Sequence, residues 1–116
     1  MLEIEKTVIE PEVVVVAVAG RVQLGRECQR VQWTLEELIQ ADQKGVVLDL
    51  EKVDYLDSAG VGILVTCCGK MEAAGGEILI ACAQPKVDDV FRVSKLRHIM
   101  RFYPTVAEAA GRWASA

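Results

Sequence analysis

Long apolar runs are missing from this sequence. The longest, Val13 to Ala19, falls far short of the ~20 residues that a membrane-spanning helix needs. No charged segment followed by an apolar one opens the chain in the manner of an export signal. We therefore expect a cytoplasmic protein without membrane insertion.

Cations are also scarce. The chain has 13 Lys and Arg residues against 17 Asp and Glu residues, which gives a formal charge of −4. Non-specific nucleic-acid binding requires an excess of cations that neutralise phosphates. The charge balance thus argues against nucleic acid as a partner.

Paired metal ligands are absent from the sequence as well. The four cysteines form no C-x-x-C pair, and His98 is the only histidine. Zinc sites usually show paired ligands at short spacing. We expect no metal and no cofactor, and we interpret the cysteines as small buried hydrophobic residues in a reducing compartment.

What the sequence does contain is an alternation of strand and helix patterns in 116 residues, enough for one domain over residues 1–116. Strands are predicted at 2–8, 13–19, 46–50, 78–82 and 99–103, and helices at 26–43, at 58–74, from Pro85 and after Thr105. Gly20 is expected to end the second strand, and residues 51–57 are expected to form a polar connection. The order ββαβαβαβα predicts an α/β fold whose mixed sheet is mostly parallel after an N-terminal hairpin.

Several enzyme motifs are incomplete, because each lacks a residue on which its chemistry depends. A nucleophile elbow around Ser58 would need a glycine where Leu56 stands. A dinucleotide fingerprint starting at Gly60 would need a third glycine at Val65. Asp57 follows the third strand as a receiver phosphoacceptor does, but no acidic pair follows the first strand in the required topology. We expect no catalysis by the chain itself.

The informative segment is Val46 to Gly62, in which a buried strand leads into D-S-A-G-V-G and then a helix. Its simplest interpretation is that Asp57 or Ser58 caps that helix. A second interpretation is a partner site, because Gly60 and Gly62 would leave the first turn open. It is also favoured by an apolar strip expected on the outer helix face, formed by Ala59, Ile63 and Cys67. A phosphate on Ser58 would suit the positive helix end and add charge beside Asp57.

The stretch DLEKVDYLDSAGVG resembles the signature of bacterial anti-sigma factor antagonists, the STAS domain family. Further matches are Gly20-Arg21-Val22, the Gly75–Leu79 segment, and the late apolar residues Phe91, Leu96, Ile99 and Phe102. The resemblance implies a single STAS-like domain with helices packed mainly on one side of the sheet. The sequence departs from the family pattern at Gln23, where an acidic residue is common, and at Ala59, where a second hydroxyl residue is common.

The resemblance also implies a function. An anti-sigma factor that is a serine kinase would phosphorylate Ser58, and a metal-dependent serine phosphatase would reverse the step. The unphosphorylated chain would bind the kinase and free its sigma factor, and ATP would be the ligand of the kinase. The implied contact residues are Gln23, Asp57, Ser58, Ala59, Gly60, Gly62 and Ile63.

Two other functions stay open. The chain could be a constitutive STAS scaffold, as a subunit of a sensory complex or of a lipid transporter. It could also be a small hydrolase that uses Ser58, although the failed elbow motif argues against this.

Overall fold

The computed structural model of the chain describes residues 2–9, 12–93 and 100–114. Its strands are β1 (Leu2–Ile9), β2 (Val13–Val22), β3 (Gly45–Leu56), β4 (Glu77–Ala81) and β5 (Arg101–Tyr103). Its helices are α1 (Arg26–Gln40), α2 (Ser58–Ala73), α3 (Pro85–Val93) and α4 (Val106–Ala114). The predicted order of elements is confirmed; Leu96 and Ile99, which were part of the expected pattern, lie outside the described residues.

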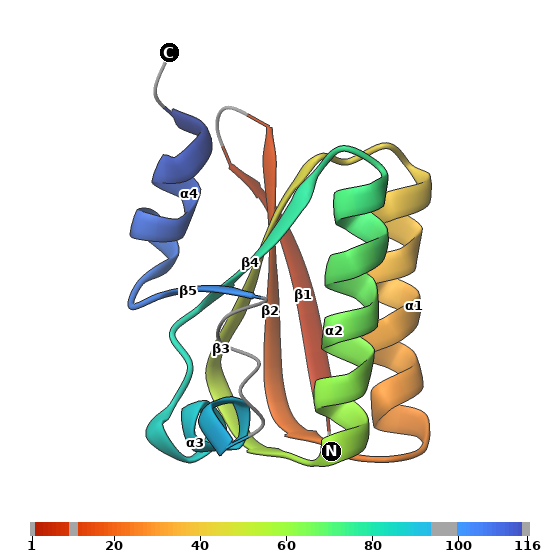
Figure 1. Cartoon of the computed structure of the whole chain (residues 1–116), viewed down its shortest axis with the longest axis vertical. Coiled ribbons are helices and arrows are strands. Elements are labelled where there is room, and N and C mark those ends of the chain that lie inside the picture. Colours follow the sequence, from red (N-terminus) through yellow and green to blue (C-terminus); the bar gives the residue numbers. More distant parts are fainter. Residues whose placement is uncertain (1, 10–11, 94–99, 115–116) are drawn as a thin grey trace.

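The five strands form one sheet in the order β1-β2-β3-β4-β5 (Figure 1). β1 pairs with β2 in antiparallel fashion, and each later pair is parallel. The predicted hairpin and mostly parallel sheet are therefore confirmed. Because β2, β3 and β4 run in the same direction, the loops that follow them lie at one end of the sheet.

Two strands are longer than predicted. β2 continues past Gly20 to Val22, and β3 continues through the expected polar connection to Leu56. The pairing shifts register between Ala17 and Ala19 and again between Gly20 and Arg21. Each shift places an extra residue in β3, and such bulges break the alternation by which a strand is recognised in a sequence.

The apolar core lies on both faces of the sheet. Val14, Val16 and Val18 of β2 pack in the larger core, which includes buried residues of α1, α2 and α3. Val13 and Val15 point the other way, into a smaller core that includes Ala109 of α4. The prediction that Val13 to Ala19 is buried on both faces is confirmed for Val13 to Val16 and for Val18, but Ala17 and Ala19 are only half-buried. The prediction that most helices lie on one side of the sheet is confirmed (Figure 1).

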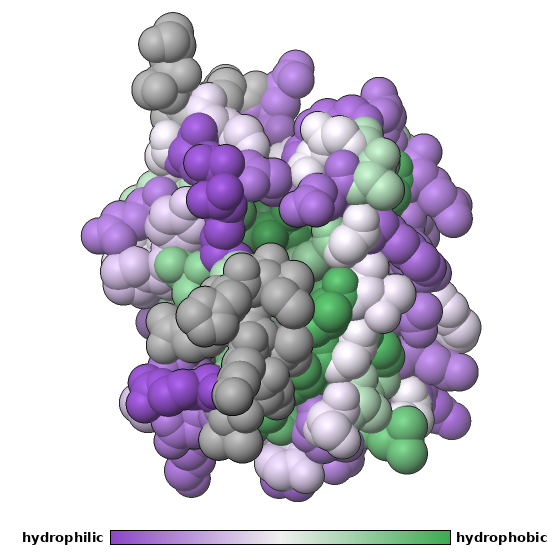
Figure 2. All heavy atoms as spheres, in the orientation of Figure 1, coloured by the Kyte–Doolittle hydropathy of each residue, from purple (hydrophilic) through white to green (hydrophobic). Residues whose placement is uncertain are grey.

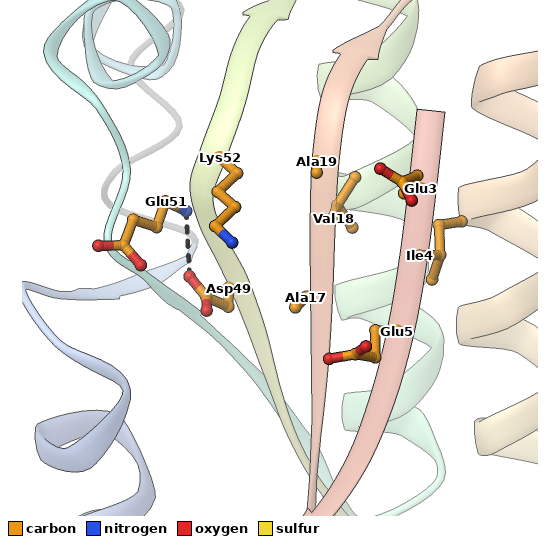
Figure 3. Close-up of a pocket in the computed structure, with 9 residues that line it drawn as sticks. All are labelled: Glu3, Ile4, Glu5, Ala17, Val18, Ala19, Asp49, Glu51 and Lys52. Carbon is orange, nitrogen blue, oxygen red and sulfur yellow. Dashed lines mark hydrogen bonds between the residues drawn. The ribbon is translucent and has the colours of Figure 1, made fainter. Parts of the chain in front are cut away.

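α4 covers only part of the second face of the sheet. Further along β2, Ala17 and Ala19 form the floor of a shallow hollow of about 450 Å³ that is rimmed by charged side chains (Figure 3). Glu5 and Asp49 flank Ala17 from the neighbouring strands, and Glu3 and Lys52 flank Ala19. The alanines thus belong to a solvent-facing part of the sheet.

Candidate functional site

The segment D-S-A-G-V-G lies where β3 passes into α2, at the lower end of the two long helices in Figure 1. The turn from β2 into α1 lies beside it. The Asp57 N–H donates to the Val22 carbonyl oxygen at 3.2 Å, which joins the ends of the two strands. Two connections that are more than 30 residues apart in the chain therefore form one surface.

Asp57 holds this surface together through both carboxylate oxygens. Oδ1 accepts a hydrogen bond from the Gly60 N–H at 2.9 Å, which makes Asp57 the N-cap of α2. Oδ2 accepts from the Leu24 N–H, also at 2.9 Å. One side chain therefore caps the helix and ties the β2–α1 turn to it. The predicted cap is confirmed, and it is Asp57 rather than Ser58.

These hydrogen bonds also set the ionisation of Asp57. Desolvation raises the pKa of its carboxyl. Hydrogen bonds from the backbone N–H groups of Gly60, Leu24 and Ala59 together lower the pKa by more than desolvation raises it. The net result is a pKa below the ordinary value. Asp57 is thus a firmly ionised structural anion with both oxygens engaged, and it is a poor acceptor for an additional proton.

Ser58 is the first residue of α2, and its side chain is exposed. Its hydroxyl makes no hydrogen bond to any residue that the structure describes, so it stabilises none of them through hydrogen bonding. Asp57 already accepts from the Gly60 N–H, but the dipole of α2 is positive at this end and favours further negative charge nearby. The position is therefore chemically open and suited to an anionic modification.

The two glycines of the first turns differ. Gly60 is buried, and a Cβ there would lie 2.5 Å from Leu56 Cδ1 and 3.1 Å from the Val22 carbonyl oxygen. Its small size is required by packing inside the domain, so the expectation that it leaves the turn open is wrong. Gly62 is exposed, and a Cβ added there would have nothing within 4 Å.

The expected apolar strip on the outer face of α2 is only partly present. Ala59 and Ile63 are half-buried against the core, with some surface left exposed. Cys67 is fully buried, which contradicts its predicted outward position. The reason is that α2 packs on the sheet and also against α1, which covers a second side of the helix (Figure 1). Gln23, in the β2–α1 turn, is half-buried.

Sequence reasoning missed one residue of this surface. Leu24 lies in the same turn and is 77 % exposed, although its backbone is bonded to Asp57. The only signal in the sequence is an isolated large apolar residue between Gln23 and Gly25, just before a helix. Figure 2 shows an apolar group at this lower end of the molecule, below α1.

The acidic residues near the segment are not gathered into one site. Asp49 lies in the hollow on the opposite face of the sheet, where its Oδ1 accepts from the Glu51 N–H at 3.0 Å (Figure 3). Asp57 lies at the start of α2 instead. Among residues 2–9, 12–93 and 100–114, no three His, Cys, Asp or Glu residues converge in a way that could hold a metal ion.

The four cysteines are unpaired thiols, and Cys28 and Cys67 belong to the larger apolar core. Cys28 and Cys67 are buried, whereas Cys68 and Cys82 are half-buried. Burial raises the pKa of Cys67 to about 11 and that of Cys68 to about 12, which keeps both thiols protonated. A protonated thiol is a weak nucleophile and a weak ligand. The interpretation as buried hydrophobic residues is confirmed for Cys28 and Cys67.

The fold and this surface define a small α/β domain that presents a free serine at a helix start, with helices mainly on one side of a mixed sheet. The family model of the STAS domain matches residues 5–109, and the chain belongs to this family.

Among the helices that the structure describes, none has the length and apolar character needed to cross a membrane.

Individual relatives agree with this assignment. The chain is 29 % identical over 80 residues to the anti-sigma F factor antagonist of Paenibacillus polymyxa, covering 68 % of each protein. An anti-sigma factor antagonist from Mycobacterium paratuberculosis matches in structure with a TM-score of 0.88 and 19 % identity, over 99 % of this chain and 96 % of that one. The phosphorylated form of the Bacillus cell fate determinant SpoIIAA matches with a TM-score of 0.73 and 22 % identity, over 95 % and 98 %.

Proposed function

We propose that this chain is an anti-sigma factor antagonist whose binding is switched off by phosphorylation of Ser58. In the unphosphorylated state it binds an anti-sigma factor that is a serine kinase, and the kinase then releases its sigma factor. The observation that carries the proposal is the exposed Ser58 hydroxyl, which no described residue engages, beside an Asp57 that is fully engaged. Family membership and the phosphorylated Bacillus relative support it.

The phosphoryl transfer needs little from this chain beyond position. Ser58 Oγ attacks the γ-phosphorus of ATP held by the kinase, the bond to the β-phosphate oxygen breaks, and ADP leaves. The hydroxyl proton goes to a base of the kinase. Asp57 does not fit that role, because both of its oxygens accept backbone hydrogen bonds and its pKa is lowered.

The phosphate acts as a switch through charge. It adds about −1.5 to −2 charges at neutral pH immediately after Asp57, at the surface that faces the kinase. The start of α2 tolerates this charge because its N–H groups and dipole are positive there. The domain therefore keeps its fold. The phosphate on Ser58 no longer matches the surface of the kinase, which already holds the negatively charged polyphosphate of its nucleotide, and binding weakens.

The remaining predicted contact residues extend this surface along α2 and into the neighbouring turn. Gly62 is open to solvent, and Ala59, Ile63 and Gln23 each keep part of their surface exposed. A metal-dependent serine phosphatase restores the binding form when water displaces phosphate from Ser58 Oγ.

Binding measurements with an anti-sigma kinase encoded in the same genome test the proposal. Ser58→Ala should bind the kinase with ATP present as tightly as the parent does without hydrolysable nucleotide. Ser58→Asp should bind at least about tenfold more weakly, because even one added charge lies at the interface centre. Gln40→Glu adds one charge at the far end of α1 and is the matched control, with binding like the parent.

The opposite pattern supports the scaffold alternative. If Ser58→Asp binds as tightly as Gln40→Glu, and the parent complex persists in ATP, phosphorylation does not control binding and the proposed switch is wrong.

A further inference from the structure

Leu24 is an unusual residue for an exposed turn, because its backbone is fixed while its side chain is not covered. Its N–H is bonded to Asp57 Oδ2, and the turn residues on either side are bonded too. The Gln23 carbonyl accepts from Cys28, and the Gly25 carbonyl accepts from Gln29. Yet 77 % of Leu24 remains exposed. An apolar side chain on a pre-ordered backbone loses little backbone entropy when a partner covers it.

The hydrogen bond to Asp57 also fixes where Leu24 lies relative to Ser58. From the lengths of one side chain and one peptide unit, the Leu24 nitrogen lies within about 10 Å of the Ser58 Cα. An interface of ordinary size buries about 800 Å² per partner, which corresponds to a disc of about 16 Å radius. The backbone of Leu24 therefore lies within reach of a protein that brings ATP to Ser58 through such an interface.

Charge around the turn indicates what such a partner must offer. The stretch from Val22 to Gly25 has no charged side chain. The guanidinium of Arg21, which precedes it, stacks over the Tyr55 ring at 4.3 Å from the ring centre. The carboxylate of Asp57 is occupied by backbone N–H groups. Gln23 of this turn is polar and half-buried, and the exposed Arg26 follows the turn, so Leu24 is the large apolar side chain that the turn offers to a partner.

From these observations we infer that Leu24 is the anchor by which this chain selects its kinase, and that the kinase receives it in an uncharged, apolar pocket beside its nucleotide site. The inference rests on the function proposed above, since it names a determinant of that same encounter. Leu24 contributes to binding and not to chemistry, because its hydrocarbon side chain cannot transfer a proton or hold a phosphate.

The test compares two residues with nearly the same exposure. Val8 is 75 % exposed and pairs with Val14 near the start of β2, whereas Leu24 follows the end of that strand. At about 3.3 Å per residue, the two ends lie roughly 25 Å apart. Val8→Ser is therefore the matched control for Leu24→Ser, and both variants keep the backbone N–H. Leu24→Met retains the apolar area and serves as the rescue variant.

The measurement is the steady-state rate of Ser58 phosphorylation by the kinase that modifies the parent chain. Leu24→Ser should raise KM at least about tenfold with kcat unchanged, as expected when uniform binding is lost. Val8→Ser and Leu24→Met should stay within about twofold of the parent, and all variants should share its denaturant midpoint. If Leu24→Ser behaves like Val8→Ser while the parent is phosphorylated, the inference alone is wrong. If no kinase modifies the parent, the proposed function fails and this inference fails with it.

Discussion

The start of α2 has an interior side and a solvent side that differ in what they require of the sequence. On the interior side, Asp57 uses both carboxylate oxygens and Gly60 leaves no room for a methyl group. On the solvent side, Ser58 is exposed and Gly62 has open space around it. The D-S-A-G-V-G motif therefore combines residues that build the surface with residues that are free to use it.

The largest effect on stability is expected at Gly60. In Gly60→Ala the new methyl group would approach Leu56 Cδ1 to 2.5 Å and the Val22 carbonyl to 3.1 Å. Overpacking of this kind typically costs about 1–3 kcal/mol, more than alanine returns in helix propensity. Denaturant unfolding monitored by circular dichroism measures the change in the free energy of unfolding.

Gly62→Ala is the matched control for that substitution, two residues along the same helix. A methyl group there meets nothing within 4 Å. Replacing a helical glycine by alanine then stabilises by up to about 1 kcal/mol. Equal shifts of the same sign in both variants would contradict the distinction between the two sides.

The next largest effect is expected at Asp57. Asp57→Ala removes the helix cap and the acceptor for the Leu24 N–H. Loss of an N-cap typically costs about 1–2 kcal/mol. Thermal and denaturant unfolding of parent and variant at neutral pH measure the difference.

The pH dependence of that difference is the control. The folded pKa of Asp57 is lowered, so its contribution is fully present above the unfolded value of about 3.9 and is lost as pH falls through the folded pKa. The stability gap between parent and Asp57→Ala should therefore narrow in acid below about pH 4. A gap that stays constant or widens in acid is incompatible with a hydrogen-bonded carboxylate.

The smallest effect on stability is expected at Ser58. Its hydroxyl bonds to no described residue and its side chain is exposed. Ser58→Ala should therefore change the free energy of unfolding by less than about 0.5 kcal/mol. A loss as large as that of Asp57→Ala would mean that Ser58 is a structural residue, and the solvent side would no longer be separable from the interior one.

The sequence predicted the succession of elements because the apolar patterns are long and glycines separate them. It did not predict the full length of β3, because two bulges break the alternation: the first puts Glu51 and Lys52 side by side on the surface, and the second does the same for Asp54 and Tyr55. Nor did it predict the burial of Cys67, since a helix packed on two sides shows no single apolar stripe.

The candidate site was also only partly predictable. Asp57 and Ser58 were identified from local helix-capping chemistry and from the resemblance of their motif to a known family. The role of Gly60 depends on Val22, which is distant in the chain and reaches it only through the pairing of β2 with β3. Leu24 could be identified only from its exposure and from its hydrogen bond to Asp57, and a sequence pattern shows neither.

The most direct test of the central claim is intact mass measurement with site mapping. The purified chain would be incubated with ATP and, in turn, with each histidine-kinase-like ATPase encoded in the same genome. We predict a gain of one phosphate at Ser58 with one of them, and none in Ser58→Ala. A stable complex that gains no phosphate with any kinase would contradict the account and favour a constitutive scaffold.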